Sequence, residues 1–173
     1  MIVGIGGVSR AGKTTLANLM AKLFLARGKS VGIIHQDKYV HEESALPRIR
    51  DSVNWEHPSS IRIEDFREAI VDAEKENDLV IAEGLLCFYN PEITDLMDRK
   101  ILVTISKDTF LERKKEDLRW GSEPDPDWYM EHIWHSYLKY GKPQTAEYFT
   151  INGNQYFDLI TVVQYILHSG ESN

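Results

Sequence analysis

The chain has almost no cysteine and no long apolar run, and these absences exclude several classes of protein. Cys87 is the only cysteine in 173 residues, so the chain can form neither an internal disulfide nor a metal cluster built from several thiolates. No stretch approaches the roughly 20 apolar residues of a membrane span. The amino-terminal residues 1–7 also lack the basic region of a secretory signal. We therefore expect a cytoplasmic protein.

Basic charge is scarce as well. The 20 Lys and Arg residues are outnumbered by 27 Asp and Glu residues, which gives a formal net charge of -7. Proteins that bind nucleic acid or anionic membranes usually carry dense basic runs, and this chain has none. We expect small-molecule partners, no nucleic acid and no membrane. The length predicts one domain over residues 1–173, acting as a monomer or a homodimer.

Short apolar runs alternate with stretches of helical spacing along the chain. The apolar runs predict strands at 2–6, 30–35, 79–84, 101–105 and 149–151. Helical spacing predicts helices at 15–27, 61–73, 110–119, 128–140 and 157–167. The alternation predicts an α/β fold in three layers, with a central, mainly parallel five-stranded sheet. The polar segment 36–58 is predicted to be mostly loop around a short helical or extended piece, and long loops are usually functional.

The segment from Gly7 to Thr14 matches the phosphate-binding pattern GxxxxGK[ST] and lies between a predicted strand and a predicted helix. Backbone N–H groups of such a loop surround phosphate oxygens, Lys13 reaches the β- and γ-phosphates, and the Thr14 hydroxyl binds the Mg²⁺ of ATP. The predicted ATP-binding residues here are Gly7, Val8, Ser9, Arg10, Ala11, Gly12, Lys13, Thr14 and Thr15. The guanine-reading motif NKxD and the switch motif DxxG are absent, which argues against a GTPase switch.

Two carboxylates occupy strand ends, where ligands of parallel α/β folds bind. Asp37 closely follows the predicted strand 30–35 and is the candidate general base, because a carboxylate beside Mg²⁺ can accept the proton of an attacking hydroxyl. Glu83 ends another strand, where an acidic residue commonly holds Mg²⁺ or its water. The structural alternatives are a turn-capping Asp and a solvated strand-end Glu.

The predicted helix 110–119 supplies cations. Arg113 and Arg119 are candidates for stabilising the charge on a transferring phosphoryl group, and a solvated helix face is the alternative. Trp55 and Trp120 offer flat surfaces for a base, although aromatic residues are more often part of the core. A phosphate loop alone does not establish catalysis, so a regulatory nucleotide-binding protein stays open beside a kinase.

Four motifs together resemble the nicotinamide riboside kinases, which are relatives of the uridine kinases. They are the phosphate loop with its glycines, Gln36-Asp37, the segment from Ile81 to Leu86, and Trp134 with the segment from Tyr137 to Tyr140. The resemblance covers nearly the whole chain. It implies a P-loop kinase fold with a helical lid at about residues 113–130, and ATP-dependent, Mg²⁺-dependent phosphorylation of the 5′-hydroxyl of nicotinamide riboside in NAD biosynthesis. Uridine or cytidine is the alternative substrate.

The same resemblance implies roles for particular residues. It assigns proton acceptance to Asp37 and Mg²⁺ binding to Thr14 and Asp37. The implied substrate-binding residues are Asp37, Lys38, Tyr39, Val40, Trp55, Glu56, Lys114 and Asp125. Glu56 stands where the family's ribose-binding acid is expected, and Lys114 stands in place of a lid arginine. A late loop that contains Gly153, Asn154 and Gln155 resembles the family's adenine-side loop.

Overall fold

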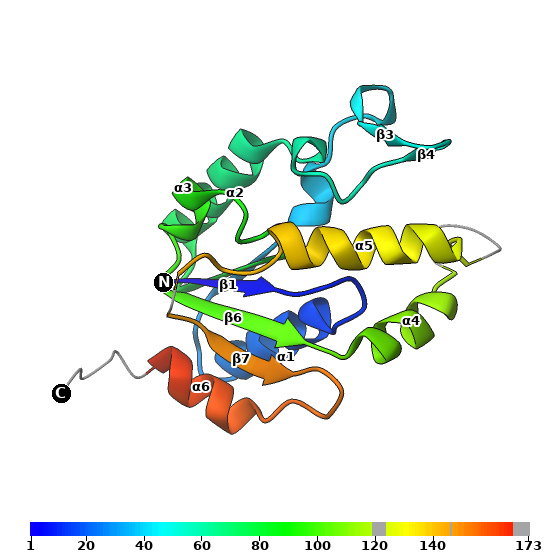
Figure 1. Cartoon of the computed structure of the whole chain (residues 1–173). Helices are drawn as coiled ribbons and strands as arrows, with labels where there is room; N and C mark the ends of the chain where they lie inside the picture. The colour runs from blue at the N-terminus through cyan, green and yellow to red at the C-terminus, as the bar shows by residue number, and fades with distance from the viewer. Residues whose placement is uncertain (119–123, 146, 168–173) are drawn as a thin grey trace.

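A five-stranded parallel sheet forms the centre of the fold (Figure 1). The computed structural model describes residues 1–118, 124–145 and 147–167. The strands are β1 (Ile2–Gly6), β2 (Val31–His35), β5 (Leu79–Gly84), β6 (Arg99–Thr104) and β7 (Phe149–Asn152). Their spatial order is β2-β5-β1-β6-β7, and every neighbouring pair is parallel. The predicted α/β architecture is confirmed.

Helices cover both faces of the sheet, as parallel strands require for their crossovers. The helices are α1 (Lys13–Leu25), α2 (Ile63–Glu76), α3 (Pro91–Thr94), α4 (Lys107–Lys115), α5 (Asp127–Tyr140) and α6 (Leu159–Leu167). Figure 1 shows α1 and α6 on one side of the sheet and α2, α3 and α5 on the other. All residues of β1 and β5 are buried between these layers. No helix in the described part of the chain has the length and apolar character needed to cross a bilayer.

The helix predicted at 110–119 has different ends in the structure. It begins three residues earlier, at Lys107, because the Ser106 hydroxyl accepts a hydrogen bond from the backbone N–H of Thr109 at 3.1 Å and caps the first turn. It ends at Lys115, and the next turn is closed by the Asp117 N–H on the Lys114 carbonyl at 3.1 Å. The prediction was wrong at both ends. The last predicted residue, Arg119, lies outside the described residues.

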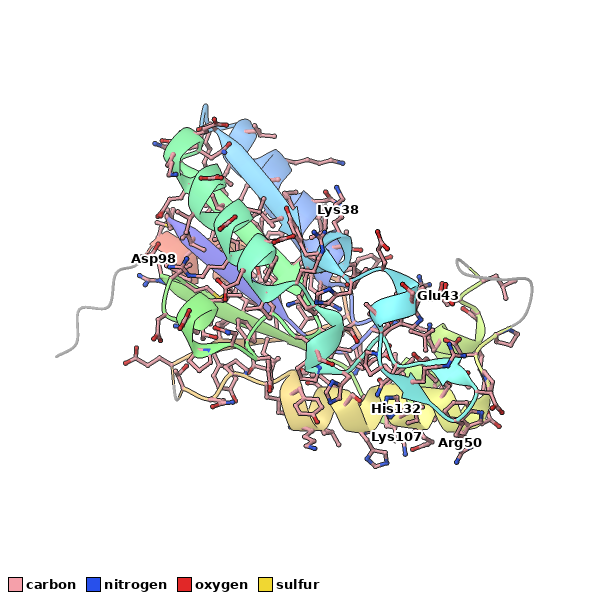
Figure 2. The ribbon with its side chains drawn as sticks, turned by 90° about the horizontal axis from the view of Figure 1, so that it is seen from above. Lys38, Glu43, Arg50, Asp98, Lys107 and His132 are labelled. Atoms are coloured by element: carbon pink, nitrogen blue, oxygen red, sulfur yellow. The ribbon has the colours of Figure 1, made fainter. Side chains whose placement is uncertain are left out.

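Residues 36–60, which follow β2, contain several short elements. Together they form an arm over the sheet edge. A 3₁₀ turn covers Gln36–Tyr39, and β3 (Arg48–Ile49) pairs with β4 (Ser52–Val53) as an antiparallel hairpin. The hairpin lies beside α5 (Figure 2), where the guanidinium of Arg50 sits 4.5 Å from the centre of the Trp128 ring. His132 of α5 also hydrogen-bonds the Asn54 side chain through Nε2 at 2.7 Å. These contacts hold the arm above the carboxyl ends of the strands.

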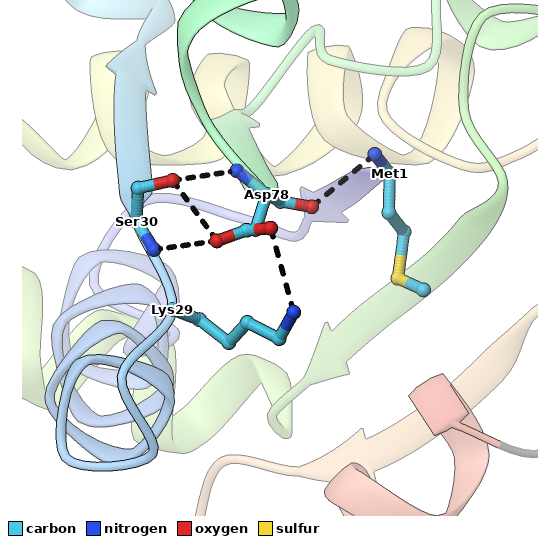
Figure 3. Close-up of polar contacts among 4 residues, drawn as sticks. All are labelled: Met1, Lys29, Ser30 and Asp78. Atoms are coloured by element: carbon cyan, nitrogen blue, oxygen red, sulfur yellow. Dashed lines mark hydrogen bonds and ion pairs between the residues drawn. The ribbon is translucent and has the colours of Figure 1, made fainter.

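A polar cluster around Asp78 fixes the alignment of β2 and β5 at their amino ends (Figure 3). The Asp78 carboxylate accepts hydrogen bonds from the backbone N–H of Ser30 at 2.9 Å and from its hydroxyl at 3.1 Å. The Ser30 hydroxyl oxygen in turn accepts from the Asp78 N–H at 2.9 Å. With this end fixed, the parallel register places His35 beside Glu83 at the carboxyl ends of the same two strands.

Candidate active site

The phosphate loop between β1 and α1 depends on glycine at two positions. Gly7 and Gly12 have φ angles of 149° and 102°. A Cβ on Gly7 would lie 2.4 Å from the Val103 carbonyl oxygen, and one on Gly12 would lie 3.0 Å from the Phe157 ring. The first turn of α1 carries no acidic side chain, so its partial positive charge is available to an anion. The loop therefore has the geometry of a phosphate cradle.

Lys13 and Asp37 face one large cavity of about 810 Å³, which opens between the phosphate loop, the arm and α5. Ser9 and Lys13 line its phosphate-loop end, and Asp37 enters from the turn after β2 as an exposed residue. Further predicted residues line the same cavity, namely Val40, Trp55, Glu56, Lys114 and Asp125. The structure thus brings the predicted phosphate site and most of the predicted acceptor site into one space.

Some predicted residues lie elsewhere. Tyr39 is half-buried and packs its ring against Phe66 of α2, with ring centres 5.6 Å apart, and it does not line the cavity. Lys38 is exposed and also outside the cavity wall (Figure 2). The predicted substrate contacts of these two residues gain no support from the geometry. Trp120 and Arg119 lie outside the described residues.

The Mg²⁺ ligands predicted from the sequence supply oxygen atoms from three elements. Thr14 lies in the first turn of α1, Glu83 lies near the end of β5, and Asp37 lies in the turn after β2. The Thr14 hydroxyl donates to Glu83 Oε1 at 2.9 Å. The described residues contain no group of three or more His, Cys, Asp or Glu side chains able to hold a metal ion. Mg²⁺ characteristically binds one or two protein oxygens together with substrate phosphates, so this sparse set of hard oxygen donors fits a metal that arrives with ATP.

Arg113 joins the phosphate loop to the loop after β7. Its guanidinium donates to the carbonyl of Arg10 at 3.1 Å and to the carbonyl of Gly153 at 2.9 Å. A second cavity of about 210 Å³ lies here, lined by Ala11, Gly12, Thr15, Leu19, Arg113, Gly153, Gln155, Tyr156 and Phe157. Its position beside the phosphate loop suits part of a donor nucleotide. Of the three predicted residues after β7, Gly153 and Gln155 line this cavity and Asn154 does not. The contact of Arg113 with a phosphoryl group stays a prediction.

Lys114 is a buried cation with carboxylate partners. Its Nζ lies 2.7 Å from Asp125 and 3.6 Å from Asp117. The pair with Asp125 connects α4 to the residues just before α5, along the cavity wall. Separating the buried ammonium group of Lys114 from these carboxylates would leave an uncompensated charge in the interior, which costs free energy. The two carboxylates therefore hold Lys114 in place. The structure therefore brings together Lys114 and Asp125, which were both predicted from the resemblance.

Glu56 faces the cavity from the arm and contacts Tyr129 of α5. The Tyr129 hydroxyl lies 2.8 Å from Glu56 Oε2 and 2.9 Å from the Val53 carbonyl oxygen. Burial raises the pKa of Glu56 from 4.5 to about 7, against the lowering effects of the Tyr129 hydroxyl and the Lys114 charge. One hydroxyl proton cannot serve two acceptors, and a protonated Glu56 removes this conflict by donating to the Tyr129 oxygen.

The raised pKa of Glu56 predicts a loss of stability with rising pH. Between pH 4.5 and about 7 the folded protein keeps a proton on Glu56 that the unfolded chain releases, so the free energy of unfolding falls as pH rises through this window. The shift in the pKa of Glu56 corresponds to a decrease of roughly 3 kcal/mol in the free energy of unfolding across this window. We expect Glu56→Gln to remove most of this decline. Urea unfolding of the unmodified protein and of Glu56→Gln at pH 5 and pH 8 measures this decline. An equal decline in the two proteins would contradict the raised pKa of Glu56.

Sequence reasoning missed several residues of the site, among them Tyr129 and His35. Tyr129 lies in a predicted helix where an aromatic residue is ordinarily core. His35 ends β2, and its Nδ1 lies 2.7 Å from Glu83 Oε1. The rule that singled out Glu83, a polar side chain at the end of a buried strand, applies equally to His35 and was a usable signal.

The sequence of the chain is similar to those of known kinases. No family model matches the chain. It is 29% identical over 144 residues to a uridine kinase of Leuconostoc citreum, spanning 68% of this chain and 69% of the relative. It is 28% identical over 187 residues to a uridine kinase of Chlamydia pneumoniae, spanning 92% and 80% of the two chains.

Solved structures show the same fold. A possible uridine kinase from Bacillus stearothermophilus has a TM-score of 0.58 at 18% identity, with 87% of this chain and 88% of the other covered. A shikimate kinase from Bacteroides thetaiotaomicron has a TM-score of 0.59 at 20% identity, with 96% and 98% covered. The chain therefore has the fold of the P-loop kinases. Within that class, its sequence is similar to uridine kinases over most of its length.

Proposed function

We propose that this protein is an ATP-dependent nucleoside kinase that phosphorylates the 5′-hydroxyl of a ribose. The observation that carries the proposal is the single cavity in which Lys13 of the phosphate loop and the exposed carboxylate of Asp37 face an acceptor space bounded by Trp55 and Glu56. Its volume of about 810 Å³ lies in the usual range for small-molecule sites. The similarity to uridine kinases supports the same substrate class.

In this proposal the residues of the site divide phosphate binding, proton acceptance, metal binding and nucleoside binding among them. The loop amides, the start of α1 and Lys13 hold the phosphates and balance the charge that develops on them. Asp37 aligns the attacking hydroxyl and accepts its proton. Thr14, with Glu83 and Asp37, would hold Mg²⁺, which would help to neutralise the phosphate charge when it is bound. Trp55 and Glu56 bind the nucleoside.

The proposed acceptor is nicotinamide riboside, and the charge of the cavity supports this choice. Among the described residues that line it are the carboxylates of Asp37, Glu43, Asp51 and Asp125 and the cations of Lys13, Arg48 and Lys114. Glu56 also lines it, but its raised pKa of about 7 leaves it out of this balance of full charges. Lys114 is already neutralised by Asp125. The remaining negative charge and the exposed ring of Trp55 favour a positively charged pyridinium over a neutral pyrimidine. The relatives' names favour uridine as the second candidate.

We expect nicotinamide riboside to be phosphorylated with a kcat/KM about ten-fold higher than that of uridine or cytidine, because a cation–π contact is worth about 0.5–2 kcal/mol. Side-by-side kinetics at fixed Mg-ATP measure the ratio. Faster use of uridine would assign the chain the second substrate and leave the roles of Lys13 and Asp37 unchanged.

The broader proposal is tested by ADP release. The protein is mixed with Mg-ATP and a panel of nucleosides, with pantothenate, ribulose phosphate and shikimate as acceptors of other classes. Turnover above the acceptor-free rate with a nucleoside supports the proposal. ATP binding without turnover on any acceptor would instead indicate a regulatory nucleotide-binding protein.

A further inference from the structure

Three side chains from three elements meet at one carboxylate oxygen of Glu83. His35 Nδ1, at the end of β2, lies 2.7 Å from Oε1, and the Thr14 hydroxyl, at the start of α1, lies 2.9 Å from the same atom. Glu83 is only 5% exposed, and the parallel register sets it directly beside His35. The contact between His35 and Glu83 is therefore built into the pairing of β2 and β5.

The chemistry of these groups fixes where the protons are. An ionised carboxylate only accepts hydrogen bonds, so the proton of the imidazole is on Nδ1 and the hydroxyl proton of Thr14 points to Glu83. The lone pairs of the Thr14 oxygen are then directed away from Glu83 and are available to a cation. Both hydrogen bonds end on Oε1. Glu83 thereby orients the hydroxyl, and His35 holds Glu83.

The backbone that follows Glu83 is fixed independently by Gln36, the first residue after β2. Gln36 Oε1 accepts a hydrogen bond from the backbone N–H of Leu86 at 2.9 Å. Its amide packs so closely on Gly84 that a Cβ there would lie 2.3 Å from Gln36 Oε1. Because Gln36 holds the chain at this point, the contact of His35 acts on the carboxylate alone. A change at His35 should therefore affect the carboxylate and spare the strand.

We propose that His35 is a positioning residue that holds Glu83, and through it the Thr14 hydroxyl, in the orientation that receives the Mg²⁺ of a bound nucleotide. The inference rests on the proposed function only in taking the phosphate loop to bind a magnesium nucleotide. Hydrogen-bond partners that orient metal-binding groups typically change metal affinity by 10- to 100-fold when they are removed.

The test measures ADP binding by calorimetry as a function of Mg²⁺ concentration, with no acceptor present. Mg²⁺ is expected to tighten ADP binding, and the Mg²⁺ concentration that gives half of this effect is the measured quantity. We expect His35→Ala to raise that concentration by about 10-fold or more. His35→Asn should restore it to within a few-fold, because the Asn amide nitrogen lies as many bonds from Cα as Nδ1 does. His35→Gln, whose amide lies one bond further out, should not. The control is His135→Ala, which removes an exposed histidine 3.8 Å from Glu131 on α5.

The possible outcomes separate this inference from the proposed function. An unchanged Mg²⁺ dependence in His35→Ala would overturn it, and so would an Asn variant as impaired as the Ala variant. If His35→Ala does not fold, the comparison of Asn with Gln decides, and equal behaviour of the two counts against the inference. Because the readout is ADP binding, failure to phosphorylate any nucleoside would contradict the proposed function and leave this result standing.

Discussion

Replacement of Lys13 by alanine is expected to lower kcat/KM for phosphoryl transfer by about 10² or more, which corresponds to about 3 kcal/mol of lost transition-state stabilisation. Lys13 begins α1 and lines the cavity, and its Nζ donates to the Val8 carbonyl of the phosphate loop at 3.1 Å. This position puts its charge next to the phosphates that the loop would hold. Steady-state kinetics with Mg-ATP and the preferred nucleoside measure the effect.

The matched control is Lys22→Ala, which removes the same charge from an exposed position in the last turn of the same helix. Its kinetics should stay within two-fold of the unmodified protein. Both variants should keep the thermal unfolding midpoint within a few degrees, because neither side chain contributes to the core. Near-normal turnover in a folded Lys13→Ala protein would rule out the phosphate-loop assignment.

The parts of the fold with a strong hydrophobic pattern, either a helical period or a continuous apolar run, were predictable from the sequence. β1 and β5 are continuous apolar runs because they are buried on both faces, and this leaves an unmistakable pattern. The hairpin of β3 and β4 has two residues in each strand, which is too short for any period. Near the end of α4, Lys114 is paired at 2.7 Å with Asp125, which lies well beyond the helix in the sequence, and such a tertiary contact leaves no local signal.

The same distinction applies to the candidate site. Asp37 and Glu83 could be predicted as candidates from position alone, because the ends of parallel strands meet at one edge of the sheet. Tyr129 and Glu56 come together from α5 and the arm, and nothing near either residue in the sequence indicates their contact at 2.8 Å. Tyr39 is the reverse case: it lies close to Asp37 in sequence but packs its ring against Phe66, so its predicted substrate contact stays a prediction without support from the geometry. Proximity along the chain is a weak guide within a 3₁₀ turn, where successive side chains point in different directions.

We expect the loss of the Asp37 carboxylate to affect turnover far more than ATP affinity, and this gives the second large prediction. Asp37 is exposed on the cavity wall, in the turn that follows β2, whereas the phosphate loop comes from β1 and α1. We expect Asp37→Asn to lower kcat by about 10² or more, because an amide cannot accept the proton of the attacking hydroxyl. ATP affinity should change by only a few-fold. Single-turnover rates and ATP titrations of the same preparations measure the two quantities.

The control for Asp37 is Asp72→Asn, which neutralises an exposed carboxylate paired with Lys75 on α2, away from the cavity. It should leave both turnover and ATP affinity unchanged, which separates the loss of a base from a general change in net charge. The decisive comparison is between the two losses in Asp37→Asn. A general base acts only in the chemical step, so turnover falls while ATP binding persists. Equal losses in turnover and ATP affinity would show that Asp37 instead maintains the shape of the turn and, through it, the nucleotide site.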